Sequence, residues 1–398
     1  MLMQNPIFIP GPTNMPERVR RAIDLPSLDH RSARFGDMLG PTLDGVKQIL
    51  KTEEGDVIVF PASGTGGWEA AITNTLCPGD RVLVARYGMF SHRWIDLCQR
   101  HKLDVQIVDC PWGMGAPADR FEEILRADRD YRIKAVLATH NETATGVLSD
   151  MAAVRAALDA ADHPALFMVD GVSSIASVDF RMDAWGVDVA VTGSQKGFML
   201  PAGLAIVGVS KKAQAAMANA ECPRCFFDFR DMLTTNASGG YPYTPAVALM
   251  AGLRESVDML LEEGLDVVFA RHHRIAEGVR QAVHAWGLDI CARSPTLYSD
   301  TVTAVVVPGG FDGNVVVSHA ADAYDVAFGV GLGDVAGKVF RIGHLGAMTD
   351  VMALSGLAAA EMVMADLEMP VTPGAGVAAA QAYYRATRAG AVVERKAA

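Results

Sequence analysis

Up to about residue 208, short apolar runs alternate with amphipathic stretches. The apolar runs are DVIVF (56–60), RVLVA (81–85), DVQIVD (104–109), KAVLATH (134–140), ALFMVD (165–170), DVAVTG (188–193) and LAIVGV (204–209). The amphipathic stretches have helical spacing, as in GGWEAAITNTL (66–76), SHRWIDLCQRH (91–101) and DMAAVRAALDAA (150–161). Continuous apolar strands separated by helices are typical of a largely parallel sheet that helices cover on both faces. The pattern therefore predicts an α/β domain.

After Tyr241 the pattern changes. Residues 246–287 keep helical spacing throughout, and we expect one long bridging helix there. Beyond it, TAVVVPGG (303–310) and KVFRIGH (338–344) have strand character and lie among further helical stretches. We therefore predict a large domain over residues 20–260 and a smaller α+β domain over residues 261–398.

Composition and charge narrow the classes of partner. Half of the 398 residues are hydrophobic and a fifth are charged, an ordinary balance for a globular protein. Acidic residues outnumber basic ones by 46 to 35, giving a formal net charge of −11, whereas nucleic-acid and anionic-membrane partners require a basic surface. No apolar run is long enough to span a bilayer, and MLMQNPIFIPGPT lacks the basic region of a signal peptide. We expect a cytoplasmic protein with neither kind of partner.

Six cysteines are scattered through the chain, as expected for reduced thiols rather than a disulfide framework. One pair, Cys222 and Cys225, forms a CxxC motif, which occurs in redox sites and as half of a zinc site. No second CxxC exists, and no strand-helix-strand context surrounds this one. We interpret the motif as structural and expect no metal site.

A glycine-rich turn follows the first predicted strand. In FPASGTGGWEAA the strand ends at Phe60 and a helix is predicted to begin near Gly67. Exposed backbone N–H groups and the positive end of the helix dipole at such a junction suit a phosphate monoester. The spacing matches neither a dinucleotide fingerprint nor a Walker A loop. Glycine can also serve a purely steric need in such a turn, so the turn alone does not decide between the two roles.

Two charged residues follow predicted strands one strand-helix-strand interval apart. Asp170 ends ALFMVD, and Lys196, the only basic residue between Asp188 and Val209, follows DVAVTG. Parallel sheets place ligand-binding groups at the carboxyl ends of their strands, so both side chains can emerge on one edge. Asp170 by itself could equally be a helix cap. A phosphate cradle, a strand-end carboxylate and a partly desolvated lysine are together what pyridoxal 5′-phosphate requires.

Five motifs extend this pattern along the chain, in the order SGTGGWE, THNETATGV, VDGVSS, GSQKGFMLPAG and RIGHLG. Together they resemble the class V aminotransferases of the fold-type I pyridoxal phosphate enzymes, and most of all the serine–, L-aspartate– and alanine–glyoxylate aminotransferases. The resemblance runs from FIPGPTNMP to RIGHLGAMTD, nearly the whole chain. It implies a large domain around a mainly parallel seven-stranded sheet, a smaller α+β C-terminal domain and bound pyridoxal 5′-phosphate.

The resemblance also implies a role for each matching position. Lys196 would hold the cofactor covalently and move the substrate's Cα proton, which requires a depressed pKa, and Asp170 would pair with the pyridine nitrogen. Arg341 would bind the substrate α-carboxylate through its guanidinium fork. The other implied cofactor contacts are the phosphate ligands Thr65, Gly66, Gly67 and Gln195, the stacking residue Phe90, where close relatives have Trp, and the ring neighbours Thr143 and Val172.

A homodimer is a further implication. Tyr241 and Thr244, in GGYPYTP, match positions that reach the phosphate of the neighbouring subunit in this family. A plain proline-rich turn is the alternative interpretation of that stretch. Residues 1–19 are expected to pack on the small domain or on the partner subunit.

The implied reaction passes the amino group of a small L-amino acid to glyoxylate in two stages, giving glycine and a 2-oxo acid. L-Serine needs only a small polar pocket and L-aspartate a second cation, so the donor stays open between these two, with L-alanine as a third alternative. Basic clusters are usually solvated surface, but those that could supply the cation contain His30, Arg31, Arg34, His272 and His273.

The sequence lacks residues that other classes of protein would require. A cysteine desulfurase shares the fold and lysine motif but needs a mobile cysteine in its small domain, and no cysteine follows Cys291. It also usually stacks a histidine where Phe90 falls. A nicotinamide-dependent oxidoreductase requires a G-x-G-x-x-G motif, which SGTGGWE does not supply. A binding or scaffold protein would not need Lys196, Asp170 and Arg341 together.

Overall fold

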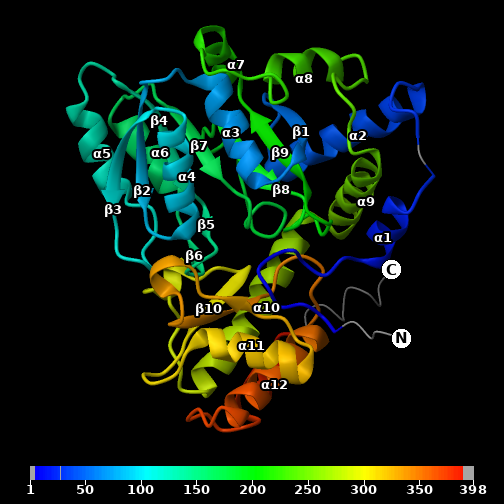
Figure 1. Cartoon of the computed structure of the whole chain (residues 1–398), viewed down its shortest axis with the longest axis vertical. Helices are drawn as coiled ribbons and strands as arrows, with labels where there is room; N and C mark the ends of the chain where they lie inside the picture. The colour runs from blue at the N-terminus through cyan, green and yellow to red at the C-terminus, as the bar shows by residue number, and fades with distance from the viewer. Residues whose placement is uncertain (1–4, 27, 389–398) are drawn as a thin grey trace.

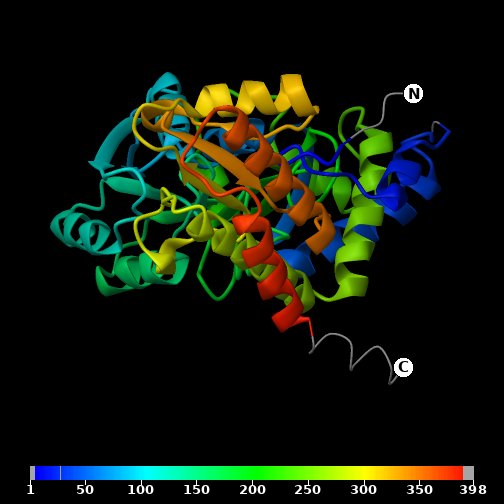
Figure 2. The ribbon, with the colours of Figure 1, turned by 90° about the horizontal axis from the view of Figure 1, so that it is seen from below.

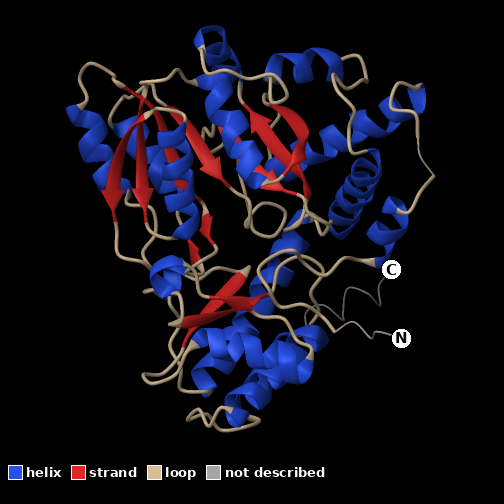
Figure 3. Cartoon of the chain, viewed as in Figure 1, coloured by secondary structure: helices blue, strands red, loops and turns tan. Residues whose placement is uncertain are grey.

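A seven-stranded sheet forms the centre of the larger of two units in the computed structural model, which describes residues 5–26 and 28–388 (Figures 1 and 3). The strand order is β1-β9-β8-β7-β4-β2-β3, and β9 runs antiparallel to both of its neighbours while the remaining pairs are parallel. The strands are β1 (Asp56–Ala62), β2 (Arg81–Arg86), β3 (Asp104–Asp109), β4 (Ile133–Thr139), β7 (Leu166–Asp170), β8 (Val189–Gly193) and β9 (Gly203–Val209). Each predicted apolar run forms one strand, and the prediction of a mainly parallel sheet is confirmed.

Helices cover both faces of this sheet because its strands are apolar on both sides. Val57 and Val59 of β1 enter one core, whereas Ile58 and Phe60 enter the other. The first core is closed by α2 (Ala33–Leu50), α5 (Ala118–Ala127), α6 (Met151–Ala160) and α9 (Val247–Glu263). The second is closed by α3 (Gly64–Thr75), α4 (Met89–Arg100), α7 (Lys211–Ala216) and α8 (Phe229–Asn236).

The predicted bridging helix is interrupted, so the expectation of one continuous helix is wrong. Helix α9 ends at Glu263 and α10 (Leu265–Ala285) begins two residues later. Gly264 between them has φ 85°, a backbone conformation that favours glycine, and its N–H caps α9 at the Leu260 carbonyl. Helical spacing continues across the break, which is why the pattern did not reveal it. Helix α10 carries the chain into the smaller unit (Figure 1).

The smaller unit contains an antiparallel sheet in the order β10-β12-β11, with β10 (Val302–Val306), β11 (Gly329–Val330) and β12 (Val339–Gly343). Its other helices are α11 (Gly313–Tyr324), α12 (Asp350–Asp366) and α13 (Ala375–Thr387), coloured from yellow to red in Figure 2. The division at residue 260 stays a prediction, and residues 1–4 and 389–398 of the two predicted segments lie outside the described residues.

The N-terminal segment crosses between the two units (Figure 1). Phe8 forms a β-bridge with Phe328 and accepts a hydrogen bond from the Gly343 N–H. Helix α1 (Glu17–Ile23) then packs on α9. Of the helices in residues 5–26 and 28–388, none combines the length and apolar character needed to cross a membrane.

Candidate active site

Lys196 lies buried in the turn between β8 and β9, beneath the N-terminal segment. Its Nζ donates a hydrogen bond to the Pro10 carbonyl, and the Thr13 hydroxyl donates to the Lys196 carbonyl at 3.2 Å. Gly11 has φ 114°, and a Cβ there would approach the lysine Cδ to 2.5 Å. A segment more than 180 residues away in sequence thus covers the lysine, and only glycine fits at the point of contact.

The surroundings of Lys196 favour its neutral form. The pKa of Lys196 is lowered to about 8, chiefly by burial and also by the positive charge of Arg341, while the carboxylate of Asp170 opposes both effects. Near neutral pH an appreciable fraction of the amine therefore lacks its extra proton, as a nucleophile or general base requires.

Asp170 stands at the carboxyl end of β7, between Thr139 of β4 and Val191 of β8 in the sheet register. It is buried, and its Oδ1 accepts the Val172 N–H at 2.9 Å. Burial raises the pKa of Asp170 to about 7, and the charge of Glu142 raises it too, whereas the Val172 N–H and Lys196 lower it. A cationic ring nitrogen beside this carboxyl would favour its ionised form.

Helix α3 begins at Gly64, three residues before the predicted start. The first-turn N–H groups of Gly64, Thr65 and Gly66 have no acceptor within the helix, whereas the Gly67 N–H donates to the Ser63 carbonyl at 3.1 Å. A Cβ at Gly67 would lie 2.5 Å from Val191, so this glycine also meets a steric need. The described residues supply no acceptor for these three N–H groups, and such groups at a helix N-terminus can hold a phosphate.

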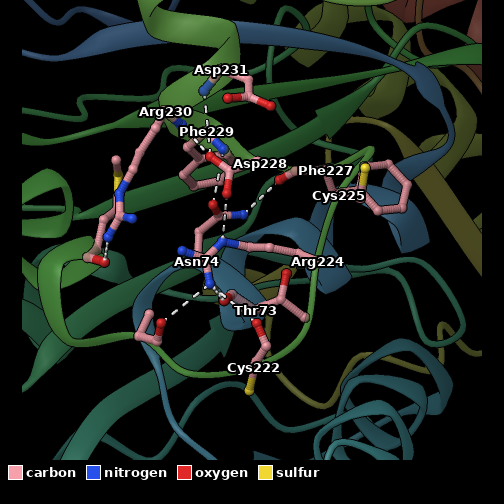
Figure 4. Close-up of polar contacts among 12 residues, drawn as sticks. Thr73, Asn74, Cys222, Arg224, Cys225, Phe227, Asp228, Phe229, Arg230 and Asp231 are labelled. Carbon is pink, nitrogen blue, oxygen red and sulfur yellow. Dashed lines mark hydrogen bonds and ion pairs between the residues drawn. The ribbon is translucent and has the colours of Figure 1, made fainter.

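The loop before α8 is tied to the far end of α3 (Figure 4). Asn74 is buried, and its Nδ2 donates to the Phe227 carbonyl at 2.7 Å while its Oδ1 accepts the Phe229 N–H at 2.9 Å. Arg224 Nη1 donates to the Thr73 carbonyl at 2.9 Å. The loop packs Phe227 within 3.2 Å of where a Cβ at Gly66 would lie, so it supports the first turn of α3.

The CxxC pair belongs to this same loop. Cys222 is buried and Cys225 is exposed, and Figure 4 shows their sulfur atoms pointing to opposite sides. The Cys225 Sγ lies 3.6 Å from the Tyr243 hydroxyl. The loop that carries both cysteines is held against α3 by Arg224 and by the backbone of Phe227 and Phe229, and a structural role of the CxxC motif stays a prediction.

Two side chains near these residues keep a buried polar atom without a partner among the described residues, namely Gln195 Oε1 and Asn141 Oδ1. Such atoms are costly unless a ligand satisfies them. With the free N–H groups of α3, the buried Lys196 and the strand-end Asp170, they are the set of groups that pyridoxal phosphate requires, so the chain fits this cofactor.

The predicted ring neighbours lie at the starts of elements or in turns. Phe90 is half-buried in the first turn of α4, and the Arg93 guanidinium lies 5.4 Å from its ring centre. Thr143 lies between β5 (Asn141–Glu142) and β6 (Val147–Leu148), a ribbon that the sequence pattern did not predict, and its hydroxyl is 2.6 Å from the Ser173 hydroxyl. Val172 is half-buried, 2.5 Å from where a Cβ at Gly64 would lie.

Arg341 projects from β12 toward the larger unit and is buried. Its Nε donates to the Val330 carbonyl at 2.8 Å and its Nη1 to the Thr143 carbonyl at 2.9 Å. Burial lowers the pKa of Arg341 to about 10, Glu142 raises it and Arg93 lowers it, so the guanidinium stays charged at neutral pH. Three of its five N–H donors remain for a substrate carboxylate.

The predicted dimer residues do not meet the others within this chain. The Tyr241 ring stands edge-on to Phe35 at 6.2 Å, and Thr244 is exposed.

The basic clusters proposed for a second cation differ in their surroundings. His272 is buried, with Nδ1 2.7 Å from the Val268 carbonyl and Nε2 accepting the Gly346 N–H, and His273 pairs with Asp300. Neither histidine is therefore free to bind a substrate carboxylate. The second candidate cluster lies at the start of α2 and consists of His30, Arg31 and Arg34. Both of its arginines are exposed.

Known proteins resemble this chain over almost its full length. The aminotransferase class-V family model matches residues 13–330. An L-aspartate–glyoxylate aminotransferase of Paracoccus denitrificans (strain Pd 1222) is 68% identical, covering 98% of this chain and 99% of its own. A serine–glyoxylate aminotransferase of Hyphomicrobium methylovorum is 53% identical over 95% of this chain and 94% of its own.

Solved structures agree with the sequence comparison. The ureidoglycine–glyoxylate aminotransferase of Bacillus subtilis superposes with a TM-score of 0.89 at 26% identity, over 97% of this chain and 99% of its own. The fold is therefore that of the fold-type I enzymes, whose class V members use pyridoxal phosphate. The chain belongs to the class V aminotransferases.

Proposed function

We propose that this enzyme transfers the amino group of L-aspartate to glyoxylate, giving oxaloacetate and glycine. The observation that carries the proposal is the 68% identity, over nearly the whole of both chains, to a protein named L-aspartate–glyoxylate aminotransferase. L-Serine is the second candidate donor, because serine–glyoxylate aminotransferases are 53% and 51% identical to this chain.

The residues would divide the work by position. Pyridoxal phosphate supplies an electron sink and carries the amino group between the two stages. The Lys196 amine, with its lowered pKa, would take the proton from the substrate Cα and deliver it to the C4′ carbon of the cofactor rather than back to Cα. Arg341 holds the α-carboxylate that donor and acceptor share. Asp170 pairs with the ring nitrogen, and the first turn of α3 with Gln195 holds the phosphate.

L-Aspartate carries a second carboxylate, and we propose that Arg93 binds it. Its guanidinium lies beside Phe90, and its charge adds to burial in lowering the pKa of Arg341, so the two cations are near each other. The described part of the chain gives Arg93 no ion-pair partner. Arg93→Gln is therefore expected to reduce kcat/KM for L-aspartate at least roughly tenfold and that for L-alanine much less.

A donor series tests the proposal. Glycine formation from glyoxylate is measured with L-aspartate, L-serine and L-alanine, and kcat/KM values are compared for the unaltered enzyme and Arg93→Gln. L-Aspartate should be the preferred donor of the unaltered enzyme. A preference for L-serine that Arg93→Gln leaves unchanged would refute both the donor and the role of Arg93, and transfer to pyruvate but not to glyoxylate would refute the acceptor.

We further propose a cytoplasmic homodimer whose sites are shared through Tyr241 and Thr244. The exposed Thr244 and the aromatic group of Phe226, 40% exposed and stacked with Tyr243, support an interface on this face. Two inactive variants, Lys196→Ala and Tyr241→Phe/Thr244→Ala, can be mixed, unfolded and refolded together. In a heterodimer, one site would combine the intact Lys196 of the second variant with the intact Tyr241 and Thr244 of the first, so activity should reappear. If Tyr241 and Thr244 acted within their own subunit, the heterodimer would have no intact site and no activity.

A further inference from the structure

The carboxylate of Glu142 is completely buried beside the candidate site. Its Oε2 accepts the N–H groups of Phe90 at 3.1 Å and Ser91 at 3.0 Å, and the Ser91 hydroxyl is 3.2 Å away. Its Oε1 accepts the Ala144 N–H, also at 3.2 Å. One side chain therefore joins the N-terminus of α4 to the turn between β5 and β6.

These two segments carry groups with different expected tasks. The start of α4 carries Phe90, the expected stacking residue, and the turn carries Thr143, whose carbonyl accepts from Arg341. The backbone of α4 rests directly on Glu142, since a Cβ at Gly88 would lie 2.2 Å from its Cγ. A displacement of the carboxylate would consequently shift the ring contact and the substrate fork together.

We propose that Glu142 is a positioning residue, which sets the placement of Phe90 relative to Thr143 and Arg341 and so determines how tightly and in which orientation the cofactor ring is held. The inference rests on the proposed roles of Phe90 and Arg341. The sequence did not single out this residue.

The chemistry of the contacts explains why a carboxylate is needed. Oε2 receives the Phe90 and Ser91 N–H groups of α4, and Oε1 receives the Ala144 N–H of the turn together with that of Phe90 at 3.2 Å. A carboxylate is an acceptor at both oxygens. A glutamine would have to turn its NH₂ group toward an N–H on one side, which would release either α4 or the turn. Burial raises the pKa of Glu142 and so favours its protonated form. The N-terminus of α4 and the positive charge of Arg341 act in the opposite direction and favour the anion.

Glu361 offers a matched control in the smaller unit. It too is buried, with Oε1 accepting from Trp286 Nε1 at 2.9 Å and the Gly376 N–H at 2.7 Å, while Oε2 accepts the Gly374 N–H at 2.8 Å. Glu361→Gln thus creates the same donor conflict at a buried carboxylate far from Phe90. It reports what such a change costs in stability alone.

The experiment titrates cofactor-free protein with pyridoxal phosphate and follows unfolding in urea and the visible circular dichroism of the bound cofactor. Both E142Q and E361Q should lower the stability of the cofactor-free protein. Only E142Q should weaken pyridoxal phosphate binding, by roughly 3- to 10-fold as expected for a lost aromatic stacking contact, and change the circular dichroism. Unchanged affinity and dichroism in E142Q would show that Glu142 serves stability only and would overturn the proposal.

Two further results keep the test decisive. If E142Q does not fold, Ser91→Ala removes one contact of the same carboxylate and should weaken binding roughly twofold with altered dichroism; wild-type binding there would overturn the proposal. If the unaltered protein bound no pyridoxal phosphate, the cofactor assignment would fail at the first titration, before any variant is compared.

Discussion

Replacing Arg341 by alanine should impair every substrate to a similar degree. Two of the five guanidinium N–H donors are used by the Val330 and Thr143 carbonyls, which leaves three for a two-point contact with a carboxylate. Losing a buried, charge-assisted fork costs about 2–4 kcal/mol, and each ~1.4 kcal/mol is tenfold, so kcat/KM should fall roughly 30- to 1,000-fold. The two orphaned carbonyls should also lower the free energy of unfolding by about 1 kcal/mol each.

The assay compares kcat/KM for L-aspartate, L-serine and glyoxylate in Arg341→Ala, Arg341→Lys and Arg274→Ala. Lysine should recover only part, because a point charge cannot reproduce the fork. Arg274 forks onto Asp350 within the protein at 2.6 and 2.7 Å, so its removal should lower stability without a matching loss of activity. A loss confined to one donor would mean that Arg341 binds a side chain and that another cation holds the α-carboxylate.

Three other changes test the remaining roles. Borohydride reduction and peptide mapping should place the pyridoxyl group on Lys196, and a label on another lysine would exclude that role. Asp170→Asn should keep the cofactor but lower kcat at least about 100-fold, because an uncharged amide cannot stabilise the protonated ring nitrogen. A near-normal kcat would exclude this role of Asp170. Incorporation of pyridoxal phosphate into cofactor-free protein should accelerate as pH rises through about 8, where Lys196 loses its proton, and Arg341→Ala should move that midpoint upward because Arg341 lowers this pKa. A midpoint near 10 in the unaltered protein would contradict the burial of the amine.

The strands were predictable because their information is local. Each run of apolar residues is long enough to cross a sheet buried on both faces, and all seven formed strands. The break at Gly264 and the β5–β6 ribbon were not predicted, since one glycine within a helical pattern and a two-residue strand leave almost no periodic trace.

The candidate site was only partly predictable for a different reason. Lys196 and Asp170 follow apolar strands and stand out as charges, so the pattern drew attention to both. The cover that Pro10 and Gly11 place over Lys196 depends on a contact between residues 186 positions apart, and no local feature announces it. Glu142 was overlooked because a glutamate is ordinarily solvated and the two-residue strand that carries it leaves no pattern, and only the fold buries it against α4.

The charges at the site are costly to the fold, which argues that function retains them. Asp170 has a folded pKa of about 7, above that of an exposed carboxyl, so the folded chain binds a proton that the unfolded chain releases, and stability falls as pH rises from about 4 to 7. Lys196 has a lowered pKa, so its burial costs stability below about 8, and this cost fades as the unfolded amine also loses its proton near 10. Between pH 7 and 8 both penalties act, and the hydrogen bonds from Val172 and to Pro10 offset only part of them.

Apolar side chains of similar size would avoid both penalties, so the free chain gains nothing from this pair of charges. A ligand that brings a cationic nitrogen to Asp170 and reacts with the amine of Lys196 would remove both penalties at once. The stability that these two charges cost the ligand-free protein would then be added to the free energy of binding.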